Sequence, residues 1–299
     1  SAAEYFGHDS SNIEEALSLL EMRDNLSGTD TKKQLIDFIA DVILETTPQL
    51  PDLRFEQITK NGWSDIFTKD SEYKYYLGFV ASLFNLQFSE CTDHEMRGIR
   101  ANIISSDTSY SIVALNYDMV LENLVAFMRS HYCWENGSSI SFSDDSLFQN
   151  DNKACTFVKI HGSVKDRQII PPTFNKGLYG SELSKSWLLA HNCLEKANKI
   201  RVLGYSLPPS DSYIKYLLMS AVDILKNLDV IDWISLDPNG DVRTRFDRTI
   251  TFREKRFCSR NIVDYLKAIY NQNIDESKYV GNDKVTFDRL EQAHEYFMK

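Results

Sequence analysis

Four short apolar runs in this chain end on small polar residues or glycine, and these ends carry the side chains that could do chemistry. The runs cover 111–115, 156–160, 200–203 and 233–236, and they lead into Asn116-Tyr117-Asp118, His161-Gly162-Ser163, Gly204-Tyr205-Ser206 and Asp237-Pro238-Asn239. Short apolar runs bounded by turn residues predict buried strands. Open parallel sheets bind ligands beyond the carboxyl ends of their strands. The four clusters therefore predict one nucleotide site that contains groups able to react.

Two of these side chains are candidates for catalysis. The amide of Asn116 can donate and accept a hydrogen bond at once, so it could orient a sugar hydroxyl or a water molecule. A polar amide that ends an apolar run is also expected to find a partner. His161 could act as a general base, and Gly162 after it would permit a close approach of the ligand. The competing interpretation of His161 is an ordinary structural histidine.

The remaining candidates have weaker signals. Asp118 could bind a ligand or simply cap the helix that follows it, because a carboxylate is favourable at a helix N-terminus. Gly204 lets backbone approach a ligand, and the hydroxyl of Ser206 could bond to phosphate or ribose. Asp211 is placed to cap a helix that begins near Ser212. No metal site is predicted, because the chain has neither an H-x-x-x-H nor an H-E-x-x-H pattern.

Charge and composition narrow the class of protein. The net charge of −10 argues against direct binding of nucleic acid, which needs a basic face. One basic stretch, from Arg243 to Arg260, fits a solvated strand pair or a subunit contact, with a patch for nucleic acid or another anionic partner as the alternative. The 5 cysteines form no C-x-x-C pair, which favours a reduced cytoplasm. No run reaches the roughly 18 apolar residues of a membrane helix, and no signal peptide is recognisable.

The periodicity of apolar residues predicts an α/β fold. The pattern is helical over about 12–105 with no strand before Tyr110, and strands then alternate with helices at about 119–129, 184–197 and 212–228. Such alternation is typical of parallel sheets. We expect a single domain over 1–299: a Rossmann-like, mostly parallel sheet with flanking helices over about 110–260, a helical subdomain on the N-terminal side, and a C-terminal helical segment over 261–299 with helices at 261–270 and from Phe287.

The order of the clusters resembles the sirtuin superfamily, and in particular its prokaryotic sirtuin-like branch in bacterial anti-phage defence systems. The resemblance covers about 110–239 and rests on N-Y-D at 116–118, H-G at 161–162, P-P-T at 171–173, a helix with Trp187, and G-Y-S-L-P-P-S-D at 204–211. It implies an NAD⁺ hydrolase that cleaves the bond between nicotinamide and ribose. NAD⁺ would be the substrate, and the product ADP-ribose.

The resemblance also implies roles for individual residues. Asn116 and His161 would be catalytic, with Asp118 near the carboxamide of nicotinamide. Gly204, Tyr205 and Ser206 would line the phosphate and adenosine-ribose side, and Asp237 the far rim. Ser1-Ala2-Ala3 is similar to the tail of the G-A-G-x-S-A phosphate loop of the family, which assigns Ser1 and Ala2 to the cofactor-binding set and places the glycines upstream.

One departure from the family pattern distinguishes NAD⁺ hydrolysis from protein deacylation. Only 42 residues separate Gly162 from Tyr205, and they hold a single cysteine, Cys193, so the sirtuin zinc module is absent and no zinc is expected. That module supports binding of acyl peptides, and its loss counts against deacylation. The alternatives are an NAD⁺-dependent protein deacylase and a regulatory or scaffold subunit that binds NAD⁺ or ADP-ribose without catalysis. The family further implies a homo-oligomer and an ATPase or other defence-system subunit as partner.

Overall fold

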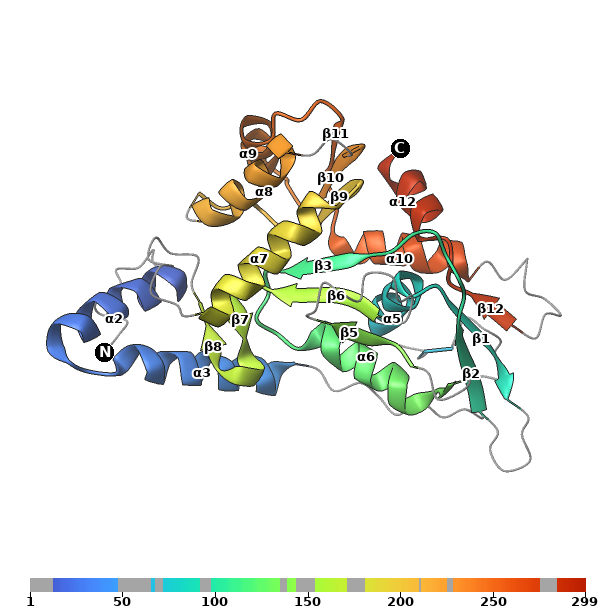
Figure 1. The fold of residues 1–299 in the computed structure, drawn as a ribbon, viewed down its shortest axis with the longest axis horizontal. Helices are drawn as coiled ribbons and strands as arrows, with labels where there is room; N and C mark the ends of the chain where they lie inside the picture. Colours follow the sequence, from blue (N-terminus) through green and yellow to red (C-terminus); the bar gives the residue numbers. More distant parts are fainter. Residues whose placement is uncertain are drawn as a thin grey trace.

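The protein is a mixed α/β structure in which helices surround mostly parallel sheets (Figure 1). The computed structural model describes residues 13–47, 66–67, 72–91, 98–134, 139–143, 154–170, 181–209, 211–224, 228–274 and 284–299. Within these ranges, none of the helices has the length and apolar character needed to cross a bilayer.

The four apolar runs form strands, as the sequence predicts. They are β3 (Ser111–Ala114), β6 (Ala154–Lys159), β9 (Lys199–Leu203) and β10 (Val230–Ile234). One parallel sheet has the order β3-β6-β5, with β5 at Ser141–Ser143, and the other has the order β11-β10-β9, with β11 at Lys255–Cys258. The two sheets contribute to one core, because Val158 in β6 and Ile160 just after it pack in the same cluster as Ile200, Ile231 and Trp233.

Helices alternate with these strands, as predicted for all but the last of them. They are α6 (Val120–His131), α7 (Ser181–Glu195), α8 (Ser212–Ile224) and α9 (Asp241–Thr249). The α7 helix packs on β6 and β3. The basic stretch 243–260 lies on α9 and β11, so it is a helix followed by a strand and not a pair of strands.

The prediction of a stretch without strands before Tyr110 is wrong. A further sheet has the order β12-β1-β2-β4, with β1 at Leu86–Cys91, β2 at Gly98–Ile103, β4 at Cys133–Trp134 and β12 at Lys284–Thr286. The C-terminal segment is accordingly not wholly helical. Polar residues separate the buried ones along β1, and its partner β12 lies far along the chain, with Gln87 opposite Thr286. Strand propensity depends on such neighbours, which a local pattern does not contain.

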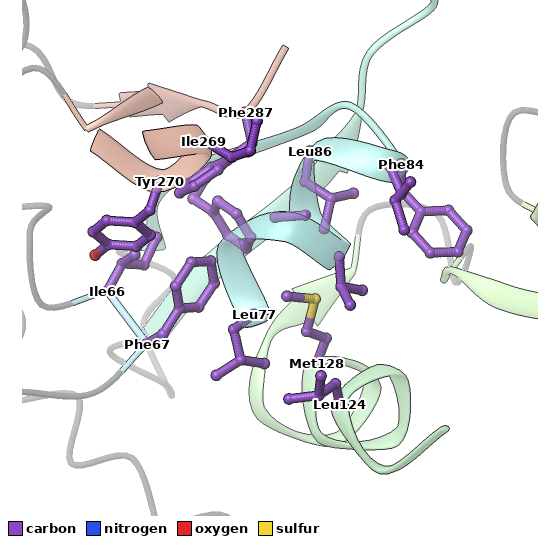
Figure 2. Packing of buried hydrophobic residues seen from close by; sticks show 14 of the residues in the cluster. Ile66, Phe67, Leu77, Phe84, Leu86, Leu124, Met128, Ile269, Tyr270 and Phe287 are labelled. Atoms are coloured by element: carbon purple, nitrogen blue, oxygen red, sulfur yellow. The ribbon is translucent and has the colours of Figure 1, made fainter. Parts of the chain in front are cut away.

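An aromatic core joins this sheet to helices from both ends of the chain (Figure 2). It lies among α5 (Tyr73–Leu83), α6, α10 (Ile262–Asn273) and β1. The ring of Phe67 lies 5.6 Å from that of Phe88 and 5.4 Å from that of Phe287. Close ring pairs of this kind add to the free energy of burial. The N-terminal side and the C-terminal segment therefore fold as partners.

A helical hairpin of α2 (Ile13–Ser27) and α3 (Thr31–Thr46) lies at the end of the molecule opposite the β1–β2 sheet (Figure 1). It packs on the small hairpin β7–β8 (Gly162–Ser163 and Gln168–Ile169) through a cluster that includes Leu17, Ile39 and Val164. Arg167 between β7 and β8 bonds Asp37 at 3.3 Å and Asp41 at 2.6 Å on α3. These contacts hold α3 beside the end of β6.

Candidate functional site

A pocket of about 430 Å³ lies beyond the carboxyl ends of β3 and β6. Its walls come from α3, from the turn after β3, from the segment that follows β6 and from the loop that follows β9. The lining residues are Ile43, Leu115, Asn116, Tyr117, Asp118, His161, Tyr205, Pro208 and Asp211. Asn116 and His161, which are 45 positions apart in the sequence, thus line the same pocket.

Strand register explains why these two residues meet. Strands β3 and β6 are parallel neighbours, with Ala114 opposite Lys159, and the N–H of Ile160 donates to the carbonyl of Ala114 at 3.3 Å. The residues that follow each strand must therefore leave the sheet at the same edge. The ladder between these two strands is enough to bring an amide and an imidazole to one place.

His161 is buried, with 3% of its surface exposed. The rings of Tyr117 and Trp187 lie near its own ring, with centroids 6.3 and 6.4 Å away. The Nε2 atom is 3.6 Å from Oδ2 of Asp211, and Nδ1 has no hydrogen-bond partner among the described residues. Buried polar atoms without a partner are rare, and Nδ1 is one of them.

Asp211 is the site residue whose position the sequence reasoning missed. It caps α8 as predicted, because its Oδ1 accepts from the N–H of Ile214 at 3.4 Å. Its Oδ2, however, accepts from the Tyr205 hydroxyl at 2.8 Å and faces His161, and the residue is only 3% exposed. A carboxylate just before a helix is ordinarily interpreted as an N-cap. No local signal distinguishes this cap from one that also contacts a histidine.

Asn116 and Asp118 lie where two pockets meet. Asn116 is exposed, so its amide is accessible to water or to a ligand. Asp118 accepts from the N–H of Val120 at 3.0 Å, which gives it the predicted place at the start of α6. Both residues also line a second pocket of about 490 Å³.

The second pocket is aromatic and acidic. Beside Asn116 and Asp118 it is lined by Glu72, Tyr73, Tyr76, Ala114, Val120, Leu121, Glu122, Phe157 and Lys159. Lys159 pairs with Glu122 at 2.6 Å and donates to the main-chain oxygen of Asp118. Burial, and then the charges of Glu72 and Asp118, raise the pKa of the Tyr76 hydroxyl, which therefore stays protonated.

The two glycines at the strand ends have different roles. At Gly162, where φ is +84°, an added Cβ would lie 1.9 Å from the carbonyl oxygen of Gln168. The β7–β8 hairpin therefore requires this glycine, whereas the sequence suggested a close approach by ligand. Gly204 is also left-handed, with φ +71°, but it is exposed and an added Cβ would meet nothing within 4 Å. Only Gly204 leaves its backbone open to a ligand.

The other predicted residues lie beyond the lining of the two pockets. Ser206 is exposed, and its carbonyl accepts from Arg245 at 3.1 and 3.2 Å. The carboxylate of Asp237 accepts from the N–H groups of Val242 and Arg243 at 3.1 and 2.9 Å. Burial would raise the pKa of this carboxyl, but the N–H donors hold it below its usual value. Ser1, Ala2 and the P-P-T at 171–173 lie outside the described residues.

The arrangement brings an amide, an imidazole and a carboxylate to one pocket at a sheet edge. An imidazole there can take a proton, and the amide can orient the group that gives it. Comparisons of the chain with protein-family models and with curated proteins find no match.

Proposed function

We propose that this chain hydrolyses NAD⁺ at the bond between nicotinamide and ribose, on a Rossmann-like arrangement of its parallel strands. The observation that carries the proposal is that Asn116 and His161 line one pocket at the carboxyl ends of neighbouring strands. Ligands bind at that end of open parallel sheets. The resemblance of the motif order to sirtuin-like proteins supplies the substrate.

The protein does not need to supply a proton to the nicotinamide leaving group. The bond from ribose C1′ to the nicotinamide nitrogen breaks, and its electron pair stays with the ring nitrogen, which becomes neutral. An oxocarbenium-like ribose results. Water adds to C1′ and loses a proton, which His161 would accept while Asn116 orients the water. The products are nicotinamide, ADP-ribose and one proton.

The surroundings of the pocket fit the remaining assignments to different degrees. Asp118 lies between the two pockets, where it could contact the carboxamide of the leaving group. Tyr205 lines the pocket, and the open backbone of Gly204 next to it suits a phosphate. Ser206 and Asp237 would contact only the distal part of an extended dinucleotide.

The test compares nicotinamide release by two pairs of variants. Asn116→Ala and His161→Ala should each lower the rate by about 10²–10⁴-fold, the usual contribution of a general acid-base group. The matched controls are Asn271→Ala on the exposed surface of α10 and His131→Ala at the end of α6, which should retain the parental rate. Products are separated by chromatography after long incubation at high protein concentration, so that a low basal turnover is measured.

Two results would contradict the proposal. Parental activity in both site variants would exclude Asn116 and His161 from the reaction. Binding of NAD⁺ by calorimetry without any release of nicotinamide would instead favour a subunit that only senses the dinucleotide.

A further inference from the structure

The second pocket, of about 490 Å³, lies on the face of the β3–β6 ladder opposite the core that the two sheets share. Successive side chains of a strand point to opposite faces. Phe157 and Lys159 of β6 line this pocket, whereas Val158 between them packs in the shared core. The first turns of α5 and α6 complete the walls. The second pocket is therefore separate from the pocket of His161, and its volume suits a small molecule.

Carboxylates outnumber ammonium groups in the lining of the second pocket. Glu72, Asp118 and Glu122 contribute three negative charges, and Lys159 contributes one positive charge. The N-termini of α5 and α6 add about +0.5 each, so about one negative charge is left over. Burial, and then the charges of Glu72 and Asp118, raise the pKa of the Tyr76 hydroxyl. The pocket therefore favours a ligand with one positive charge.

Aromatic rings make the lining suitable for an organic cation. Tyr73, Tyr76 and Phe157 all belong to it. The ammonium of Lys159 lies 5.9 Å from the centre of the Phe157 ring and 2.6 Å from a carboxylate oxygen of Glu122, and its side chain is only 10% exposed. Cations are attracted to the faces of aromatic rings. The pocket thus already stabilises one ammonium by a ring and a carboxylate together.

We propose that the second pocket binds a small organic monocation, namely a protonated amine on an apolar or aromatic body. Lys159 bonds Glu122 and the main-chain oxygen of Asp118, which leaves the Asp118 carboxylate for the ligand. That carboxylate accepts from the N–H of Val120 through Oδ1, and its Oδ2 has no donor among the described residues. The inference goes beyond the proposed function and does not depend on it.

A metal ion suits the second pocket less well than an organic cation. Hard cations need several oxygen ligands around one point. In the described part of the chain, three ligand atoms of His, Cys, Asp or Glu within 4.8 Å of one another occur only at Asp232, His294 and Glu295, and none of these lines the pocket. The carboxylates of the pocket are therefore too far apart to hold one ion together.

The test is an NMR titration of the protein with two matched compounds. Phenethylamine is protonated at neutral pH, and 2-phenylethanol has the same apolar body with an uncharged hydroxyl. We expect the amine to bind about 10-fold more tightly than the alcohol.

The deciding variant is Asp118→Asn, which removes the excess negative charge. It keeps the cap of α6, because Asn is as good a cap as Asp. It should weaken binding of the amine by about 3–10-fold and leave binding of the alcohol unchanged. Asp264→Asn, which changes an exposed carboxylate in the first turn of α10, is the matched control and should bind both compounds as the parent does.

Two further variants locate the bound amine. Tyr76→Leu keeps an apolar side chain without the ring and should weaken binding of the amine by about 3–10-fold. Tyr296→Leu, which removes an exposed ring outside the pocket, is its control. His161→Ala changes only the other pocket and should leave the affinity for the amine unchanged. Thermal unfolding shows whether each variant is folded, and Asp118→Asn decides the question if Tyr76→Leu is not.

Three results would overturn the proposal. They are no measurable binding of the amine, equal affinities for the amine and the alcohol, and a loss of amine binding in His161→Ala as large as that in Tyr76→Leu or Asp118→Asn. None of these measurements involves the release of nicotinamide, so the amine site and the hydrolase can fail separately.

Discussion

The C-terminal helix α12 (Leu290–Met298) is tied to the sheet of β9, β10 and β11 by a partly buried ion-pair network, and the buried Asp232 is at its centre. The carboxylate of Asp232 accepts from Arg256 at 2.6 and 2.7 Å and from Nε2 of His294 at 2.7 Å. Arg256 also bonds Glu295 at 2.8 and 3.0 Å. The guanidinium occupies the space between the carboxylates, so this group of side chains stabilises the fold as an ion pair.

The replacement Asp232→Asn resembles protonation of the carboxyl, which allows its effect to be worked out. Burial would raise the pKa of Asp232, but the bonds from Arg256 and His294 lower it from 3.8 to about 2. At about 1.36 kcal/mol per pKa unit, the ionised form stabilises the folded protein by about 2.4 kcal/mol near neutral pH. We expect Asp232→Asn to lower the free energy of unfolding by about 2–3 kcal/mol there.

The sign of the pH dependence follows from the depressed pKa. The unfolded chain binds the proton more tightly, so the contribution is present above a pH of about 4 and is lost as the pH falls toward about 2. Urea unfolding of the parent and the variant, followed by circular dichroism, should give curves that differ near neutral pH and converge in acid.

A matched control separates this network from surface charge. Asp41→Asn removes a carboxylate that pairs with Arg167 while both side chains are largely exposed, and exposed pairs contribute little. The reasoning would be refuted if the two variants lost the same stability, or if the loss in Asp232→Asn were as large in acid as near neutral pH.

Two further predictions concern the neighbourhood of the site and the buried thiol. Gly162→Ala should destabilise the protein by more than about 2 kcal/mol, because backbone strain adds to a collision with Gln168; Gly204→Ala should cost only the strain, about 1–2 kcal/mol. Urea unfolding compares the pair, and equal losses would contradict the collision. Burial raises the pKa of the Cys155 thiol to about 12, so iodoacetamide should modify it only after unfolding. Peptide mass spectrometry detects the modified cysteine. Modification of Cys155 in the folded protein would show that the thiol is accessible and would contradict this prediction.

The strands that form the site could be predicted because their signal is local. A parallel strand buried on both faces is a nearly continuous apolar run, and the runs that become β3, β6, β9 and β10 have that character. Asn116, His161 and Tyr205 follow three of these runs, and all three line one pocket. The end of a buried strand thus fixes which residues gather there.

The residues whose position the sequence did not predict depend on contacts that the local pattern of apolar residues does not contain. Strand β1 alternates buried and partly exposed residues, and it pairs with its neighbour β2 and with the distant strand β12. Gly162 follows a histidine at a strand end and so suggests ligand contact, yet the carbonyl of Gln168 explains it. Asp211 has the local features of a cap and no others. For Asp211, the neighbour that gives it a second contact is His161, a residue that folding and not sequence proximity brings near.

The contact between His161 and Asp211 depends on how two sheets share a core, because His161 follows β6 and Asp211 follows β9. Two indole N–H groups hold these strand ends. Trp187 donates to the carbonyl of Ile160 at 3.1 Å, one residue before His161, and the fully buried Trp233 donates to the carbonyl of Tyr205 at 2.8 Å. Each indole also packs in the cluster common to both sheets. Since a buried indole both fills the core and needs an acceptor for its N–H, the packing of that core sets the separation of the imidazole and the carboxylate. The site is therefore a property of the joined sheets, and neither strand-end motif alone contains it.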